Sequence, residues 1–179
     1  LSQTSWSQVT PGLVQNGHDT EITLSAPVWA KAVRFVGKRK TGDFDWFRLE
    51  EILVSGCAPP APPPPPPMPG ACDTTVDLGQ DPTATCSMSS VDPHWGGGST
   101  DCTSSLIDGK VAWNSASGRH VKPDGAVTVT FPYERTIEKV KIFQFHQGNA
   151  HTGFDIQVHE RGVWRTVFSQ KNWTQSAPG

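Results

Sequence analysis

The sequence has little net charge, no long apolar run and no local motif of a common catalytic site. Its 179 residues carry a formal net charge of −2, which excludes the strongly basic surface that nucleic-acid binding requires. Its apolar stretches are strand-sized, shorter than a membrane-spanning helix needs. It lacks a G-x-S-x-G elbow, a P-loop, a G-x-G-x-x-G loop and a glycosidase-like carboxylate pair. We therefore expect no enzyme activity, no nucleic-acid partner and no membrane insertion.

Cysteine is scarce, and its spacing does not suit zinc. The four cysteines form no C-x-x-C pair and no zinc-like set with histidine. Their even number favours disulfides and an extracellular protein. We expect a Cys86–Cys102 disulfide, because three glycines make the loop between them easy to close. A Cys57–Cys72 bond would have to bend the stiff proline run between them. We therefore expect Cys57 and Cys72 each to bond a cysteine outside this chain, in a neighbouring unit of the tandem repeat described below.

The two ends of the chain carry the same phrase. Residues 1–12 read LSQTSWSQVTPG, and residues 168–179 read FSQKNWTQSAPG. Ser, Gln, Trp, Gln, Pro and Gly recur at the same offsets, 168 − 1 = 167 residues apart. Self-similarity at a fixed period is typical of repeat proteins. We interpret the chain as one period of a tandem array plus the start of the next, beginning within one domain and ending within its successor.

A proline run divides the chain. Residues 58–70 read APPAPPPPPPMPG. Proline fixes φ and donates no backbone hydrogen bond, so the run favours an extended rod about 40 Å long at roughly 3 Å per residue. Three interpretations fit it: a plain linker, a structural rod, or a ligand for SH3 or WW domains, which requires a cytosolic setting. The expected organisation is residues 1–57 as the end of one domain, 58–71 as a linker and 72–179 as the start of the next.

The remaining sequence predicts short β-strands. Apolar and polar residues alternate over 20–25, 32–36, 47–54 and 126–131, and Pro132 is expected to end the last of these. Further strands are expected over 136–146, and over 154–159 and 163–168, which flank a Glu-Arg-Gly hairpin turn. No stretch shows a helical period. We expect an all-β antiparallel sandwich or jelly roll, with no helix longer than about two turns.

Several segments resemble the F5/8 type C, or discoidin-like, family. Residues 106–113 (LIDGKVAW), 127–131 (VTVTF), 137–143 (IEKVKIF) and 154–168 (FDIQVHERGVWRTVF) are similar to the front of that domain. Residues 31–57 (KAVRFVGKRKTGDFDWFRLEEILVSGC) are similar to its end. The resemblance implies an eight-stranded antiparallel jelly roll whose first and last cysteines pair across its base. The order end, linker, beginning is the one expected when an array is cut inside a domain.

The same resemblance implies a structural calcium ion. Asp108 and Glu51 match the positions that often supply its carboxylates in the family. Calcium takes six to eight oxygens, and only these two carboxylates suggest themselves. The plainer interpretations are an Asp-Gly turn for Asp108 and a solvated strand residue for Glu51.

Family members also bind ligands, often sugars, through loops at one end of the sandwich. His146 and His151 bracket a Gln-Gly-Asn-Ala turn where such a loop is expected, although a plain polar turn fits as well. Trp95, in the segment HWGGGST, is a candidate platform for stacking a sugar, or a packing residue. Asn172 begins an Asn-Trp-Thr glycosylation sequon.

The proline run resembles the linkers of hydroxyproline-rich extracellular glycoproteins of algae and plants. In those proteins the prolines are hydroxylated and carry O-linked sugar, so the resemblance implies covalent glycans here. The residues concerned are Pro62, Pro63, Pro64, Pro65, Pro66 and Pro67.

Two functions from different classes fit these features. One is a structural repeat of an extracellular filament or cell-wall array, whose partners are neighbouring copies of the same repeat. Tethering keeps adjacent units at high effective concentration, so weak contacts suffice for assembly. The other is a secreted lectin or adhesin that binds carbohydrate. Saturable sugar binding would distinguish the second from the first.

Overall fold

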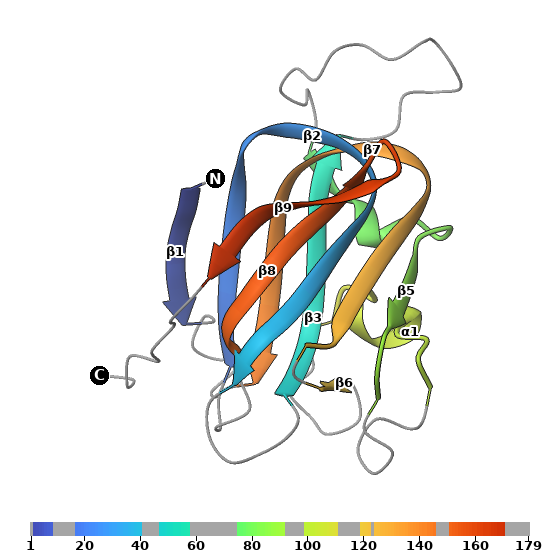
Figure 1. Cartoon of the computed structure of the whole chain (residues 1–179). Helices are drawn as coiled ribbons and strands as arrows, with labels where there is room; N and C mark the ends of the chain where they lie inside the picture. Colours follow the sequence, from blue (N-terminus) through green and yellow to red (C-terminus); the bar gives the residue numbers. More distant parts are fainter. Residues whose placement is uncertain are drawn as a thin grey trace, which may run out of the picture.

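The described part of the chain folds into an antiparallel β-sandwich that also contains two single turns of helix (Figure 1). The computed structural model describes residues 2–8, 17–40, 47–57, 75–91, 99–110, 119–122, 124–145 and 151–170. The expected all-β fold without a long helix is confirmed for these residues. The strands are β1 (Ser2–Gln8), β2 (Gly17–Lys40), β3 (Phe47–Cys57), β4 (Thr75–Asp77), β5 (Thr85–Met88), β6 (Arg119–Val121), β7 (Ala126–Phe145), β8 (His151–Glu160) and β9 (Val163–Gln170), and the helical turns are η1 (Leu78–Gln80) and α1 (Thr103–Leu106).

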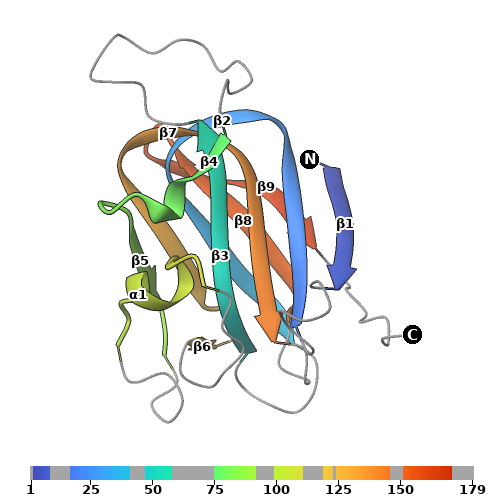
Figure 2. The same ribbon diagram turned by 180° about the vertical axis from the view of Figure 1, so that it is seen from behind.

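Two long strands, β2 and β7, run through both layers of the sandwich and join them (Figures 1 and 2). Residues 17–23 of β2 pair with 139–145 of β7 in the first layer, and residues 28–36 pair with 126–137 towards the second. The first layer has the order β1-β2-β7-β3, with β4 and β6 on the outer side of β3. The second has the order β5-β7-β2-β8-β9.

The long strands replace pairs of shorter strands that the sequence predicts. The expectation that Pro132 ends a strand was wrong, because β7 continues through it. The register of β7 on β2 jumps from Thr130, opposite Ala32, to Arg135, opposite Ala30. Pro132 lies exposed in this bulge, where its missing N–H interrupts no ladder bond.

The segments on either side of the proline run share one core. β3 pairs with β7, and β2 pairs with both β7 and β8. The ring of Phe154 lies 5.1 Å from that of Phe35 and 5.7 Å from that of Phe168, measured between centroids. Over the described residues, 1–57 and 72–179 are therefore not separate folded units. Their origin in consecutive repeats stays a prediction.

The two flanks of the proline segment meet in the sheet. Cys57 lies opposite Thr75 in the β3–β4 pairing. Cys57 is disulfide-bonded within the chain, and its partner lies outside the described residues. The expectation that Cys57 bonds outside the chain was therefore wrong. That expectation assumed that a proline rod holds β3 and β4 apart, whereas the two strands pair with each other. Residues 58–74 themselves lie outside the described residues.

The predicted hairpin over 154–168 is confirmed. Glu160 pairs with Val163, and the two residues between them both have positive φ, 50° at Arg161 and 83° at Gly162. Positive φ at both loop positions is the type I′ turn, whose twist matches that of the strands it joins.

Candidate functional site

A buried carboxylate on β3 faces the turn that follows α1. Glu51 is fully buried, and the backbone N–H of Gly109 donates to its Oε1 at 3.1 Å. Gly109 has a φ of 76°, which glycine adopts without strain. Within the described part of the chain no group donates a hydrogen bond to Oε2 of Glu51. One carboxylate oxygen is thus held and the other is unsatisfied.

Two further carboxyl groups influence Glu51. Burial is the main cause that raises the pKa of Glu51 to about 8; the Gly109 hydrogen bond opposes it, and the charges of Asp108 and Asp77 add to it. Burial also raises the pKa of Asp77, whose Oδ1 accepts a hydrogen bond from the Gly79 N–H at 2.9 Å. Asp77 is not among the site residues that the sequence predicted. Its available signal was local, an Asp directly before a Leu-Gly pair, which is typical of a helix N-cap.

Asp108 combines both interpretations that the sequence allowed. Its Oδ1 accepts a hydrogen bond from the Lys110 N–H at 2.9 Å, as a turn residue does. The same turn brings its carboxylate near Glu51. The alternative interpretation of Glu51 as a solvated strand residue was wrong, since its side chain is inaccessible.

The arrangement can accept a proton or a hard cation. Either would satisfy the unpaired oxygen of Glu51 and reduce the repulsion between neighbouring carboxylates. In the part of the chain that the structure describes, no group of three or more His, Cys, Asp or Glu side chains is placed to hold a metal ion. In a calcium site, Glu51 and Asp108 would therefore supply the side-chain oxygens, with backbone carbonyls and water completing the shell.

The residue before Glu51 is also a buried glutamate, and the sequence did not predict its burial or its ion pair. Arg48 Nε lies 2.5 Å from Oε1 of Glu50, which is fully buried. Burial raises the pKa of Glu50 to about 7, although the charge and hydrogen bond of Arg48 oppose the rise. The register of β3 on β7 shifts between Leu49 and Glu51, so Glu50 is the extra residue of a bulge. The available signal was the pair of successive glutamates in a strand, because alternation cannot turn both to solvent.

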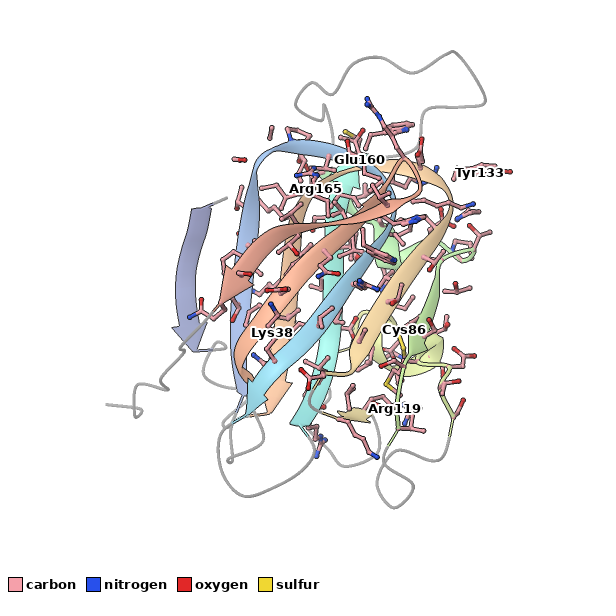
Figure 3. The ribbon with its side chains drawn as sticks, viewed as in Figure 1. Lys38, Cys86, Arg119, Tyr133, Glu160 and Arg165 are labelled. Carbon is pink, nitrogen blue, oxygen red and sulfur yellow. A yellow bond between two sulfur atoms is a disulfide. The ribbon has the colours of Figure 1, made fainter. Side chains whose placement is uncertain are left out.

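One of the two expected ligand-binding histidines, His151, begins β8 at one end of the sandwich. β7 ends at Phe145 and β8 begins at His151, which pairs with Lys40. Figure 3 shows Arg119 at this same end, with Glu160 and Arg165 at the opposite end. Only the backbone of His151 belongs to the described structure, so its role as a ligand-binding residue stays a prediction. Five sets of expected site residues lie outside the described residues: Trp95, His146, Asn172, Cys72 and Pro62 to Pro67.

The predicted Cys86–Cys102 disulfide is confirmed (Figure 3). The Cα atoms are 4.9 Å apart, and the Cys102 N–H donates to the Cys86 carbonyl at 3.0 Å. Thr103 Oγ1 accepts from the Cys86 N–H at 2.9 Å. The bond is fully buried and fastens the start of α1 to β5.

Comparisons of the chain with protein-family models, with curated proteins and with solved structures found no match. No helix in the described part of the chain is long and apolar enough to cross a membrane. The discoidin-like resemblance and the calcium ion it implies therefore stay predictions.

Proposed function

We propose that the chain is a structural repeat unit of an extracellular, glycosylated filament or cell-surface array. The observation that supports this most directly is the terminal phrase, which recurs at an offset of 167 residues. The first copy contains β1, and between the two copies lie β2 to β8 and most of β9. One period of the sequence thus contains the strands of one bead, which is the expected relation between a repeat and its folded unit.

Assembly follows from tethering and from contacts between neighbouring copies. Covalent linkage holds adjacent beads at high effective concentration, so that individually weak contacts are occupied. A heterologous contact that does not close into a ring generates a helical filament. Glycans on Pro62 to Pro67 and on Asn172 would keep such a polymer soluble and protect exposed segments from proteases.

The test uses protein from its native source. Sedimentation of the parent chain should report an extended polymer, and peptide mapping should report added oxygen and sugar on the proline-run peptide. A compact monomer in sedimentation contradicts the filament. A proline-run peptide at its unmodified mass contradicts the glycan sheath and leaves the filament itself to the sedimentation result.

The second candidate function is carbohydrate binding at the end of the sandwich where β7 ends and β8 begins. Its support is the position of His151 at the start of β8, with His146 directly after β7 in the sequence. Calorimetry and glycan arrays should then show saturable sugar binding that a His146→Ala, His151→Ala double variant loses. His159→Ala is the matched control, because His159 lies further along β8 and its ring packs at a tilt against that of Trp164, with 5.0 Å between ring centroids. Absence of saturable binding contradicts this function.

A further inference from the structure

β1 and β9 lie on the same side of the sandwich, one in each layer. β1 is the outer neighbour of β2 in the first layer, and β9 is the outer neighbour of β8 in the second. Since β8 itself pairs with β2, both edges lie on the side away from β3 and β5. Figures 1 and 2 both show β9 ending on the side that β1 covers. Among the described residues, neither strand pairs with another strand on its outer side.

These two edge strands carry the repeated phrase of the sequence. Ser2 and Gln3 of β1 correspond to Ser169 and Gln170, the last residues of β9. In the first copy these residues pair with β2, and in the second they pair with β8. A strand has two hydrogen-bonding edges, so one continuous strand can pair with β8 along one edge and with β2 along the other.

The pairing of β1 changes register at the position where such a strand would change layer. The register on β2 shifts between Gln3 and Ser5. The position between them corresponds to Lys171, the first residue after β9. β2 and β7 also shift register where they pass between layers, and bulges or bends are how strands switch sheets.

We propose that residues 171–175, continuing from β9, can take the place of β1 on the edge of β2. β9 and its continuation then form a third strand that passes between the layers, as β2 and β7 do. Residues 172–175 would stand where residues 5–8 stand in β1, with Trp173 in the place of Trp6.

The consequence rests on the proposed tandem array. There, residues 1–8 of each repeat continue β9 of the preceding repeat. When the continuation of β9 replaces β1, the segment β1–β3 of one repeat can complete the sandwich of the preceding repeat instead of its own. Each strand then keeps the same neighbours. The edge of β2 is then the junction between successive repeats, and its occupant is the continuation of β9.

The test uses the full chain and two matched pairs of proline substitutions. Successive residues of a strand direct their N–H groups to opposite edges, so two adjacent prolines remove the bond to β2 in either register. One variant carries Ser5→Pro and Trp6→Pro, the second carries Asn172→Pro and Trp173→Pro, and the third carries all four. A Val9→Pro, Thr10→Pro variant, just beyond β1, is the control. Amide hydrogen exchange is measured over residues 18–23 of β2, which β1 covers.

Either pair of proline substitutions alone should leave the amide exchange rate of residues 18–23 close to that of the unmodified chain. The other copy of the repeated phrase would still cover the edge of β2. All four substitutions together should raise the amide exchange rate of residues 18–23 roughly tenfold, since about four cross-strand pairs with β2 are lost. If the Ser5/Trp6 pair alone gives the full increase, the C-terminal copy does not replace β1 and the proposal is overturned. Protection that depends on protein concentration, with dimers in sedimentation, assigns the strand to a second chain and overturns it too. Neither failure touches the filament proposal, which rests on the native parent chain.

Discussion

Glu50 and Glu51 are neighbours on β3 and are equally inaccessible, yet the protein holds them in different ways. Glu50 pairs with the guanidinium of Arg48. Glu51 receives one backbone N–H, from Gly109, and has two other carboxyl groups as neighbours. The first environment compensates a negative charge with a positive one. The second opposes the charge, so it suits a neutral carboxyl group or a carboxylate bound to a cation.

The difference separates a buried ion pair from a buried carboxyl group that a proton or a cation would stabilise. A buried ion pair balances opposite charges and is costly to break from one side. A buried carboxylate whose charged neighbours are other carboxyl groups has no opposite charge beside it, so a proton or a metal ion would stabilise it. Burial alone therefore does not distinguish the two glutamates of β3; the sign of the neighbouring charges does.

The largest expected effect comes from removing the positive partner of Glu50. Arg48→Met should lower the free energy of unfolding by about 3–5 kcal/mol at pH 9, because it leaves an uncompensated buried charge. The loss should be smaller at pH 5, where Glu50 can be protonated. Denaturant titration at the two pH values measures both. Arg165→Met, which breaks the exposed pair with Glu160 at 3.0 Å, is the control and should cost about 0–1 kcal/mol. Equal losses for the two variants would contradict the distinction.

The next effect concerns Glu51 and pH. Its pKa is raised to about 8 in the folded protein from an ordinary value of 4.5. The folded state therefore binds the proton more tightly, and stability falls as pH rises from about 4.5 to about 8. Glu51→Gln should remove the share of this decline that Glu51 causes, which is at most about 5 kcal/mol between pH 4 and pH 9, and leave the share that Glu50 causes below about pH 7. Glu50→Gln should not raise the free energy of unfolding in this way, because it leaves the buried charge of Arg48 without the carboxylate of Glu50. A decline that persists unchanged in Glu51→Gln would assign it to another group.

The sequence predicted the features that depend on neighbouring residues. Alternating patterns located segments of β2, β3 and β7, and the Arg161-Gly162 turn located the β8–β9 hairpin. The Cys86–Cys102 bond was predicted because its loop is short and rich in glycine. Each of these is determined within a few residues, or within one loop that closes at little entropic cost.

The features that the sequence analysis missed depend on register between distant strands. Pro132 read as the end of a strand because nothing local shows that a bulge accommodates it. Cys57 read as an outward-facing end because the return of the chain through β4 is set by pairing with β3. The pairing of Glu51 with Asp108 came from the family resemblance. Pattern alone could not join a strand residue to a turn 58 residues away, the separation of Glu51 and Gly109.

Calcium offers a third way to separate the two glutamates. At pH 8, a calcium concentration about thirtyfold above the dissociation constant should raise the free energy of unfolding by roughly 2 kcal/mol. Glu51→Gln and Asp108→Asn should both lose this increase, since each removes a proposed side-chain oxygen. Glu50→Gln is the matched control and should retain it. If calcium leaves the unmodified chain unchanged, the buried Glu51 is satisfied by a proton, and the predicted calcium site is wrong.

The smallest expected effect tests how the N–H that holds Glu51 is positioned. Gly109 and Gly162 both have positive φ, 76° and 83°, so substitution by alanine strains the backbone at either position. A Cβ at Gly162 meets nothing within 4 Å, whereas at Gly109 it meets Nε2 of Gln80 at 2.9 Å. That side chain is held by its hydrogen bond to the Ile107 carbonyl at 2.9 Å.

Gly162→Ala should therefore cost about 1 kcal/mol, the backbone strain alone. Gly109→Ala should cost about 1 kcal/mol more, because Gln80 must move and the bond to Oε1 of Glu51 weakens. Loss of that bond removes an interaction that lowers the pKa of Glu51. In Gly109→Ala the decline of stability with pH should thus extend to higher pH, while in Gly162→Ala it should keep its position. Denaturant titrations between pH 4 and pH 10 measure both quantities. If the two variants shift the decline equally, the Gly109 N–H does not control the charge of Glu51, and burial alone sets it.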